Sequence, residues 1–421
     1  MRVTGFFILC LWVTNLTNAQ RKFVEIKGIV KDKENKNPLH GAVCFFKNNE
    51  HVGHVTDSSG HFKIKYPKEF SDDSLMISML GYNRQNVSVR SLSSTDTLVF
   101  LLERNAIVLK DVLIQNEKFD LKQLVLKAIE SIPKNFPDKP HLLEAFYRKV
   151  STHNHQYTHL EEAVIRIQDY NYKILPNASK IEVLAYRESK DWGDIDSITV
   201  KILSKTRTSG YNNWQTAFNP LSRLYENNNM RLFNQEDTRF HLKSFKKYMD
   251  SYLAEVVDIY TVNNDTIFHI AFNDSAFPAP PSGRSYLKIN MTDHAIIEFQ
   301  ISSQRNGHIF YRKLFKFQKT GGRYYPKFIK VTKPRLINRD IEDGEYDIAT
   351  IWFDSVKIKN FEKVKPKHVI DRLDKQGHKK PNYDPAFWLD LKMLDKYPLE
   401  RGVRKSLESY QPLEEQFQLH E

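Results

Sequence analysis

The sequence lacks most of the features that identify an enzyme or a membrane protein by inspection. Its 421 residues include only 2 cysteines and 15 glycines. No P-loop, G-x-G-x-x-G, G-x-S-x-G or C-x-x-C motif occurs in it. The usual signatures of nucleotide binding, serine hydrolysis and thiol redox chemistry are therefore absent. Beyond the first residues no stretch reaches the ~18 apolar residues that a membrane-spanning helix needs, so we expect no such helix.

The N-terminus carries a short apolar run of a different kind. Arg2 is the only charged residue before position 20, and the run extends from Val3 to Val13. Thr17-Asn18-Ala19 then places small residues at the −3 and −1 positions of a cleavage site. This pattern predicts a secretory signal peptide over residues 1–19. Cys10 lies in mid-run after Leu9 rather than after a small residue, so we expect no lipidation there.

Cleavage of that peptide leaves Cys44 as the single cysteine, which excludes an internal disulfide. Cys44 lies within the apolar stretch Ala42 to Phe46, so we expect a buried and unreactive thiol.

Composition favours a folded, β-rich and basic protein. The chain is 40% hydrophobic and 12% aromatic, which argues against wholesale disorder, and its formal net charge is +12. Because an exported protein rarely meets nucleic acid, we expect partners in the cell envelope instead: a protein, or an anionic glycan or lipid surface. The alternative is that the basic residues form a solvated surface and bind no partner. The basic clusters are Lys243, Lys246 and Lys247; Lys357, Lys359, Lys363, Lys365 and Lys367; and Lys375, Lys379 and Lys380.

Residues 22–104 contain strand signals in quick succession. Short apolar or alternating runs occur at 24–30, 42–46, 52–55, 62–66, 75–79, 87–89 and 98–102. The segment Asp57-Ser58-Ser59-Gly60 has the composition of a tight turn. Seven short strands separated by turns predict a β-sandwich.

The same region resembles the carboxypeptidase-regulatory-like domain. The resemblance lies in Gly28-Ile29-Val30, Pro38-Leu39-His40-Gly41-Ala42, the run from Thr56 to Ile64, and Gly81-Tyr82. It implies a seven-stranded transthyretin-like fold that is not catalytic. The family is common in exported proteins of Bacteroidetes-type bacteria, often ahead of TonB-dependent receptors. Residues 109–114 are similar to the short strand that follows the domain there, but the next residues do not resemble a receptor plug.

A recurrent tripeptide resembles the O-glycosylation acceptor of Bacteroidetes-type periplasmic proteins. It consists of Asp, then Ser or Thr, then a small or aliphatic residue. Such short patterns also arise by chance. The matches begin at Asp73, Asp96, Asp196, Asp265, Asp274 and Asp354.

Residues 119–421 indicate a larger β-rich domain with helical insertions. Apolar residues at helical spacing follow Asp120, an N-cap candidate, and Pro133 is expected to end that helix. The domain boundary falls between about 104 and 118. Seven strands at 256–262, 266–272, 287–291, 297–301, 310–317, 324–331 and 348–356 predict an antiparallel meander.

One face of the meander is apolar, and the other, with Lys, Arg and Glu, is expected to be solvated. Its open shape resembles the half-barrel of periplasmic lipoprotein-carrier proteins, although no motif supports that comparison. A short helix is expected around Trp388, Leu389, Leu391 and Leu394. The C-terminal tail should wrap the domain by burying Trp388 and Phe417.

One pattern suggests metal chemistry. His159 and Glu162 form an H-x-x-E pair, the spacing used by zinc carboxypeptidases, and His153 and His155 lie close by in the sequence. The alternative is a group of exposed, solvated histidines, since about one such match is expected by chance. We therefore assign no catalytic, cofactor-binding or metal-ligating residue from the sequence, and no cofactor.

The predicted fold class is mainly β: an N-terminal seven-stranded sandwich followed by an α+β domain built on an antiparallel meander. Three functional hypotheses remain open at this point. The first is a non-enzymatic, exported envelope protein whose sandwich docks onto an outer-membrane or cell-surface component. The second is a periplasmic carrier of an apolar or anionic ligand, and the third is a metal-dependent hydrolase.

Overall fold

The computed structural model describes most of the chain from residue 23 onward. The described ranges are 23–47, 53–79, 81–92, 97–104, 120–172, 179–192, 252–262, 265–274, 285–305, 308–335, 344–365, 381–409 and 411–418. The predicted signal peptide, the predicted domain boundary and the basic cluster at 243–247 lie outside these ranges. Within the described residues, no helix is long and apolar enough to cross a membrane.

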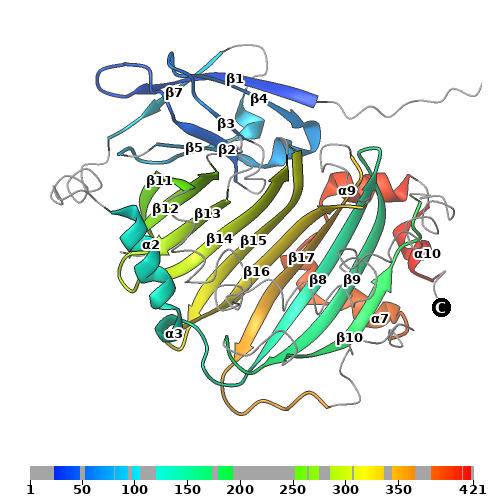
Figure 1. The fold of residues 1–421 in the computed structure, drawn as a ribbon. Coiled ribbons are helices and arrows are strands. Elements are labelled where there is room, and N and C mark those ends of the chain that lie inside the picture. Colours follow the sequence, from blue (N-terminus) through cyan, green and yellow to red (C-terminus); the bar gives the residue numbers. More distant parts are fainter. Residues whose placement is uncertain are drawn as a thin grey trace, which may run out of the picture.

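The N-terminal region is a β-sandwich of two small sheets (Figure 1). One has the order β4-β1-β7 and the other β3-β2-β5-β6, so the seven predicted strands are confirmed. Strand β7 runs parallel to β1, whereas the other pairs are antiparallel. Two short 3₁₀ turns, η1 (Lys68–Asp72) and η2 (Val89–Ser91), flank β5 and β6. The strands are β1 (Phe23–Asp32), β2 (Val43–Phe46), β3 (Gly53–Val55), β4 (His61–Pro67), β5 (Ser74–Ser78), β6 (Gln85–Ser88) and β7 (Leu98–Leu102).

The sandwich core is closely packed. Cys44 is fully buried beside Leu75 and Ile77, and burial raises the pKa of its thiol far above the ordinary value. The expectation of a buried thiol is therefore confirmed. A Cβ added to Gly28 would come within 2.4 Å of the Phe62 ring, so only glycine fits between the aromatic side chains there.

The larger region is built on one sheet of ten antiparallel strands, in the order β10-β9-β8-β17-β16-β15-β14-β13-β12-β11. Strands β11 to β17 are the seven of the predicted meander, which is confirmed. Strands β8 to β10 extend it because β8 pairs with β17. The strands are β8 (His141–His153), β9 (Gln156–Asp169), β10 (Lys180–Glu188), β11 (Tyr252–Val262), β12 (Asp265–Asp274), β13 (Ser285–Asn290), β14 (Ala295–Arg305), β15 (His308–Thr320), β16 (Arg323–Pro334) and β17 (Tyr346–Lys357).

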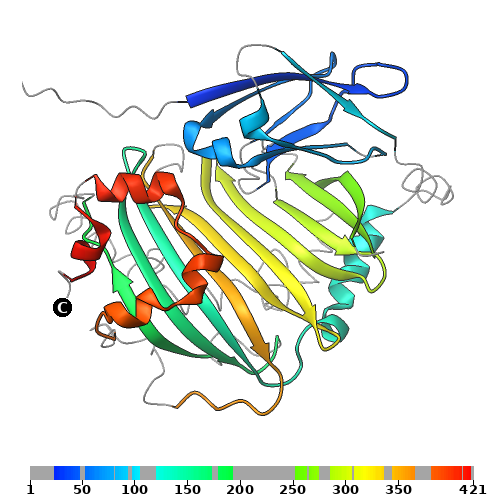
Figure 2. The ribbon, with the colours of Figure 1, turned by 180° about the vertical axis from the view of Figure 1, so that it is seen from behind.

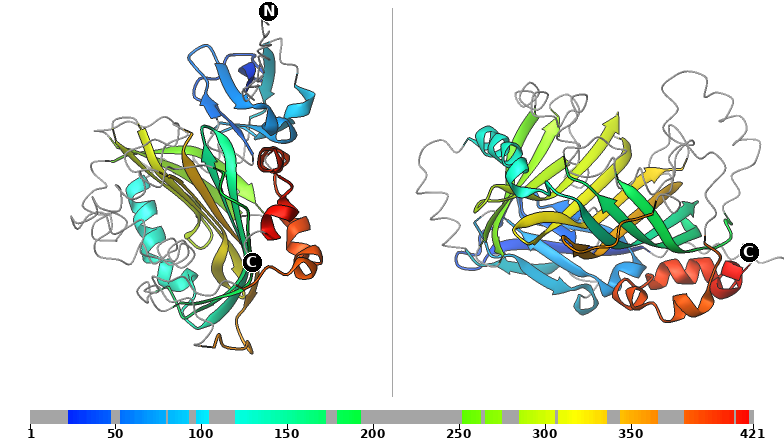
Figure 3. Two further views of the ribbon diagram at one scale, coloured as in Figure 1. Left: turned by 90° about the vertical axis from the view of Figure 1, so that its right-hand side faces the viewer. Right: turned by 90° about the horizontal axis from the view of Figure 1, so that it is seen from below.

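Helices α2 (Leu121–Glu130) and α3 (Ile132–Asn135) lie on one side of this sheet, which we call the inner face (Figure 3). The carboxylate of Asp120 caps α2 by accepting hydrogen bonds from the backbone N–H groups of Lys122 (2.9 Å) and Gln123 (3.2 Å). The predicted helix and its cap are confirmed. Pro133 does not end it, because α2 ends at Glu130 and Pro133 occupies the first turn of α3, where its missing N–H costs nothing.

Four C-terminal helices cover part of the opposite side, the outer face (Figure 2). They are α7 (Pro385–Leu389), α8 (Lys392–Lys396), α9 (Arg401–Glu408) and α10 (Leu413–Gln418). Trp388 and Phe417 are 2% and 3% exposed, so the wrapping tail is confirmed. Two expectations need correction. The segment 385–396 forms two helices rather than one, and the outer face is not simply solvated because the tail buries part of it.

A buried ion triad fixes this tail to the sheet. Glu162 on β9 accepts hydrogen bonds from Arg148 Nε (2.5 Å) and Arg187 Nε (2.7 Å). Arg148 also donates to the carbonyl oxygens of Tyr397 (2.9 Å) and Pro398 (3.1 Å). The Arg148 guanidinium thus satisfies backbone acceptors of the tail, and Glu162 pairs with both arginines. Removing one partner would leave an uncompensated charge in the interior.

The sandwich contacts the ten-stranded sheet at one of its ends (Figure 1). Arg84 of the sandwich donates from Nε to Asp258 Oδ2 on β11 (2.5 Å), and its guanidinium lies 3.8 Å from the centre of the Tyr260 ring. Asp258 is 1% exposed, so this is a desolvated ion pair. The contact joins the two regions through a charge-assisted hydrogen bond and a cation–π interaction.

A second buried charge group lies on the outer face of the neighbouring strands. Glu298 on β14 accepts from Lys288 Nζ (2.6 Å) and Tyr286 Oη (2.8 Å), and Lys316 Nζ is 3.4 Å away. Burial by itself would raise the pKa of Glu298. The charges of Lys288 and Lys316, with these hydrogen bonds, outweigh that effect and lower it from 4.5 to about 2.

This shift makes the stability of the fold depend on pH. Because the folded-state pKa lies below the unfolded one, the carboxylate stabilises the fold above pH ~5 and loses that effect as the pH falls. We expect the free energy of unfolding of the wild type, minus that of Glu298→Gln, to shrink by about 2 kcal/mol between pH 6 and pH 3. Urea unfolding of both proteins measures this difference. A difference that stays constant with pH would contradict the assignment.

Candidate functional site

The pairing register places polar side chains from distant parts of the chain in two adjacent cross-strand rows. The first row runs Ala349, Lys149, Glu161, Glu188 across β17, β8, β9 and β10. The second runs Asp347, Ser151, His159. Residues two apart on a strand share a face, so both rows lie on the inner face. We call these two rows the polar rows.

The adjoining rows on the same face are apolar or aromatic. One runs Ile351, Tyr147, Ala163, Tyr186, and the next runs Phe353, Ala145, Ile165 and Val183. The inner face therefore changes from apolar to polar between Tyr147 and Lys149. The change lies at the end of the sheet where the turn between β8 and β9 is found.

Lys149 and Glu161 form a close, largely buried ion pair within the first polar row. Burial alone would lower the pKa of Lys149, but the charges of Glu161 and Asp347 outweigh it and raise the pKa above its ordinary value. His159 Nδ1 lies 3.8 Å from Glu161 Oε1. Burial is the largest effect on His159 and lowers its pKa, so the imidazole is neutral at pH 7.

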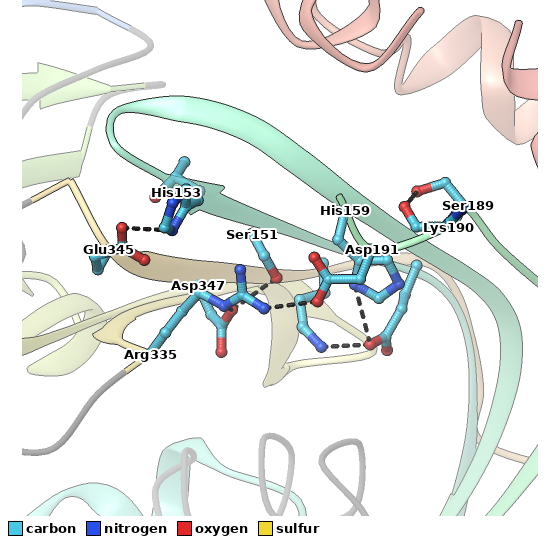
Figure 4. Close-up of polar contacts among 12 residues, drawn as sticks. Ser151, His153, His159, Ser189, Lys190, Asp191, Arg335, Glu345 and Asp347 are labelled. Carbon is cyan, nitrogen blue, oxygen red and sulfur yellow. Dashed lines mark hydrogen bonds and ion pairs between the residues drawn. The ribbon is translucent and has the colours of Figure 1, made fainter. Parts of the chain in front are cut away.

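A second group of contacts lies beside this pair (Figure 4). Ser151 Oγ donates to Asp347 Oδ1 at 2.7 Å, and Arg335 donates from Nη2 to Asp191 Oδ2 at 2.6 Å. Arg335 Nε is also 3.9 Å from Asp347 Oδ1. Arg335 directly follows β16. Its side chain therefore connects the end of β16 both to β17 and to the segment that follows β10.

Some buried polar atoms at this end have no hydrogen-bond partner among the described residues. They include the Tyr147 hydroxyl, Arg335 Nη1 and Glu345 Oε2. Tyr147 is 1% exposed, and its burial, with the charges of Glu161 and Asp347, raises the pKa of the phenol far above the ordinary value. Buried polar groups are normally hydrogen-bonded, so a further polar group beside these atoms would offset the cost of burying them.

The H-x-x-E interpretation of the sequence is wrong in this fold. His159 and Glu162 lie on a strand, where residues three apart point to opposite faces. His159 is on the inner face, and Glu162 is in the outer-face triad with Arg148 and Arg187. The alternative of exposed histidines is also wrong for His159, which is 9% exposed.

The two other histidines are not part of a cluster with His159. His153 ends β8 and lies 2.8 Å from Glu345, while His155 is exposed in the turn with a φ of 62°. Among the described residues, one group has the donor atoms of a metal site. Donor atoms of His159, Glu161 and Glu188 all lie within 4.8 Å of one another.

Sequence reasoning did not find the polar rows. The signal was present as charged residues at strand positions whose neighbours two residues away are apolar. Lys149 follows Ala145 and Tyr147, and Glu161 precedes Ala163 and Ile165. Lys313 is another example, paired between Ile301 and Val331 on the inner face. Burial lowers the pKa of Lys313 to about 8.

The basic clusters are described only in part. Lys357, Lys359, Lys363 and Lys365 are exposed, with Lys357 paired to Glu144 and Lys365 to Glu362. Lys367 and residues 375–380 lie outside the described ranges.

Comparison with protein families supports the N-terminal interpretation. The family model of the CarboxypepD_reg-like domain matches residues 26–114. The match includes the whole of the seven-stranded sandwich apart from the first residues of β1. A search of curated proteins found no match to the chain.

Several solved structures resemble part of this chain at very low sequence identity. A LolA superfamily protein from Nitrosomonas europaea is 10% identical with a TM-score of 0.23, covering 57% of this chain and 94% of that one. A putative outer membrane lipoprotein-sorting protein domain from Vibrio parahaemolyticus is 6% identical with a TM-score of 0.24, covering 57% and 93%. A DUF1329 family protein from Desulfovibrio piger is 7% identical with a TM-score of 0.22, covering 56% and 91%. At these scores the similarities carry no argument about this chain.

The Lys149–Glu161 pair is testable by a double-mutant cycle. Glu161→Gln leaves a buried ammonium without its carboxylate, so we expect it to lower the free energy of unfolding by about 3 kcal/mol. Lys149→Met combined with Glu161→Gln should recover much of that loss. Chemical denaturation of the four proteins gives the coupling energy.

The exposed pair Lys365–Glu362, at 3.8 Å, is the matched control, and its coupling should stay below about 1 kcal/mol. Equal coupling in the two cycles would show that Lys149 and Glu161 are not desolvated.

Proposed function

We propose that this chain is a non-enzymatic binding protein of the cell envelope whose ten-stranded sheet carries an apolar ligand on its inner face. The observation that supports this most strongly is the gradient along that face. An extended apolar surface ends in the polar rows, where buried polar atoms lack partners among the described residues.

The apolar part of the inner face extends across the whole sheet. Phe299 and Phe315 stack there with ring centres 4.3 Å apart. The main helical contacts on this face come from α2 with β11 and β14, and from α3 with β14 and β16. The strongest contacts of these helices are therefore with β11, β14 and β16, although the inner-face residues of β8 and β9 are also buried. Fully buried members of the face include Ile165, Ile167, Ile270, Ile289, Ile296, Ile329 and Ile351.

The polar rows would orient such a ligand. Sites for small molecules are mostly apolar with a few well-placed polar groups, and the inner face has this composition. The Tyr147 hydroxyl lies at the border between the apolar and the polar rows. A polar group at one end of the ligand would supply the hydrogen bond that this hydroxyl lacks among the described residues.

The envelope assignment rests on the N-terminal quarter of the chain, residues 1–114. The pattern of residues 1–19 is that of an export signal, and the domain matched at 26–114 resembles a family common in exported proteins. Export would bring the protein into a compartment where apolar and amphiphilic molecules need carriers between membranes.

An uncharged fluorescent probe, N-phenyl-1-naphthylamine, tests the ligand proposal. We expect saturable binding with a Kd of about 1–10 µM, in the range of a modest apolar ligand. Ala163→Phe places a ring on the inner face, next to Tyr147, and should weaken binding at least about tenfold.

Ala185→Phe is the matched control. Ala185 lies on the adjacent strand but packs against Trp388 on the outer face, so the same overpacking cost arises there without blocking the inner face. Its binding should stay within about twofold of the wild type. Equal loss in both variants, or no saturable binding by the wild type, would refute the proposal.

A second function, docking of the sandwich onto another envelope protein, is favoured by strand β7. This strand forms one edge of the three-stranded sheet, and its outward side chains are apolar: Val99 is 59% exposed and Leu101 38%. Exposed apolar edge strands are usually protected by charge or cover, because they pair readily with other strands. Strand addition by a partner protein would use this edge.

Photo-crosslinking in intact cells tests the docking proposal. We expect a benzoylphenylalanine at position 99 to trap one specific envelope protein, and Leu101→Glu in the same protein to abolish that product. Lys63, exposed on the opposite edge strand β4, is the control position and should give no such product. Equal products from both positions, or a crosslink only to a second copy of this chain, would contradict the proposal.

A further inference from the structure

We infer that His159, Glu161 and Glu188 form a binding site for a divalent transition-metal ion, with Zn²⁺ as the expected occupant. One imidazole nitrogen and two carboxylates are a donor set that Zn²⁺ accepts. The three donor atoms lie within 4.8 Å of one another. Zn–N and Zn–O bonds of about 2.0–2.2 Å place bound donors about 3–4 Å apart, so side-chain rotation is enough to close the site.

The backbone register holds these ligands in place before any ion arrives. Glu161 and Glu188 are directly paired across β9 and β10, and His159 lies two residues from Glu161 on the same face of β9. The site therefore stands on two hydrogen-bonded strands rather than on loops. Rigid elements of this kind give more precise ligand positions than loops do.

A second observation points to a missing group at the same place. The Tyr147 hydroxyl, buried one row from Glu161, makes no hydrogen bond of ordinary geometry among the described residues, although Glu161 lies close enough to act on it. Three protein ligands leave the fourth position of a tetrahedral zinc ion for water. A metal-bound water would be the polar partner for this hydroxyl when no apolar ligand is bound, and the polar end of such a ligand would replace that water.

Lys149 is the internal competitor of the ion. Its ammonium forms its ion pair with Glu161 Oε1, so a metal would take the second oxygen of that carboxylate or displace the ammonium. The site therefore differs from a dedicated zinc cage, and its affinity should depend on Lys149. This dependence separates a real site from adventitious surface binding.

The effect on the fold would be local. Strand β10 is the edge strand of the ten-stranded sheet and carries a register shift between Val183 and Ala185. An ion bound to Glu188 would tie the end of this edge strand to β9. It would lie on the inner face, next to the polar groups that bound the apolar surface.

Metal titration of the whole exported chain tests the site. The chelator-treated protein is titrated with Zn²⁺ alone, and with Co²⁺, whose visible absorption reports its coordination. We expect one equivalent of Zn²⁺ to bind with a Kd below about 10 µM. His159→Ala and Glu188→Gln should each weaken binding at least about tenfold, the size seen when a ligand or its support is lost.

Two further variants make the test decisive. His153→Ala removes another histidine near a carboxylate, Glu345, and should leave the affinity unchanged. Lys149→Met removes the competing positive charge and should tighten binding at least about tenfold. Circular dichroism shows whether each variant is folded.

The inference is overturned by any of three results: no binding below millimolar Zn²⁺, equal losses in His153→Ala and His159→Ala, or weaker binding in folded Lys149→Met. None of these results depends on whether the inner face holds an apolar ligand, because binding of N-phenyl-1-naphthylamine is measured in a separate titration.

Discussion

The antiparallel pairing of β8 with β17 is the constraint on which the rest of the larger region depends. It joins residues near 145 to residues near 353 in one register, so the sheet grows in both directions from this seam. Asp347 comes beside Ser151, and Ala349 beside Lys149, only because of that register. Without it, β8 to β10 would be a separate unit, the polar rows would lack Asp347, and the C-terminal helices would have no continuous outer face to cover.

The two faces of the sheet then take different roles through simple alternation. On β8 and β9 the outward side chains Arg148 and Glu162 anchor the C-terminal tail, while their neighbours Lys149 and Glu161 face inward and form the polar rows. A single step along the strand separates a structural ion triad from a candidate ligand site. Both groups are buried and charged. In each, removing one charged side chain would leave its partner as an unpaired charge in surroundings of low polarity.

Much of the fold was predictable from local patterns, whereas the site was not. Short alternating runs with turn residues between them identify β1 to β7 and β11 to β17, and Asp120 marks the start of α2. Asp347 joins the polar rows only through the pairing of β8 with β17, nearly 200 residues away, and Arg148 contacts the tail about 250 residues away; no local pattern encodes either contact. The H-x-x-E pair failed for a physical reason: both side chains must face one ion, and a strand points residues three apart to opposite faces of the sheet.

The most direct test of the central claim is an experimental structure of the mature chain purified from an exporting host without added ligand. We expect elongated apolar density along the rows of Ile351 and Phe353, with its polar end at Tyr147 and the polar rows. Such density would show that the inner face is a binding surface. An inner face filled from end to end by side chains of the protein itself would contradict the account, and would leave the sheet as a purely structural support.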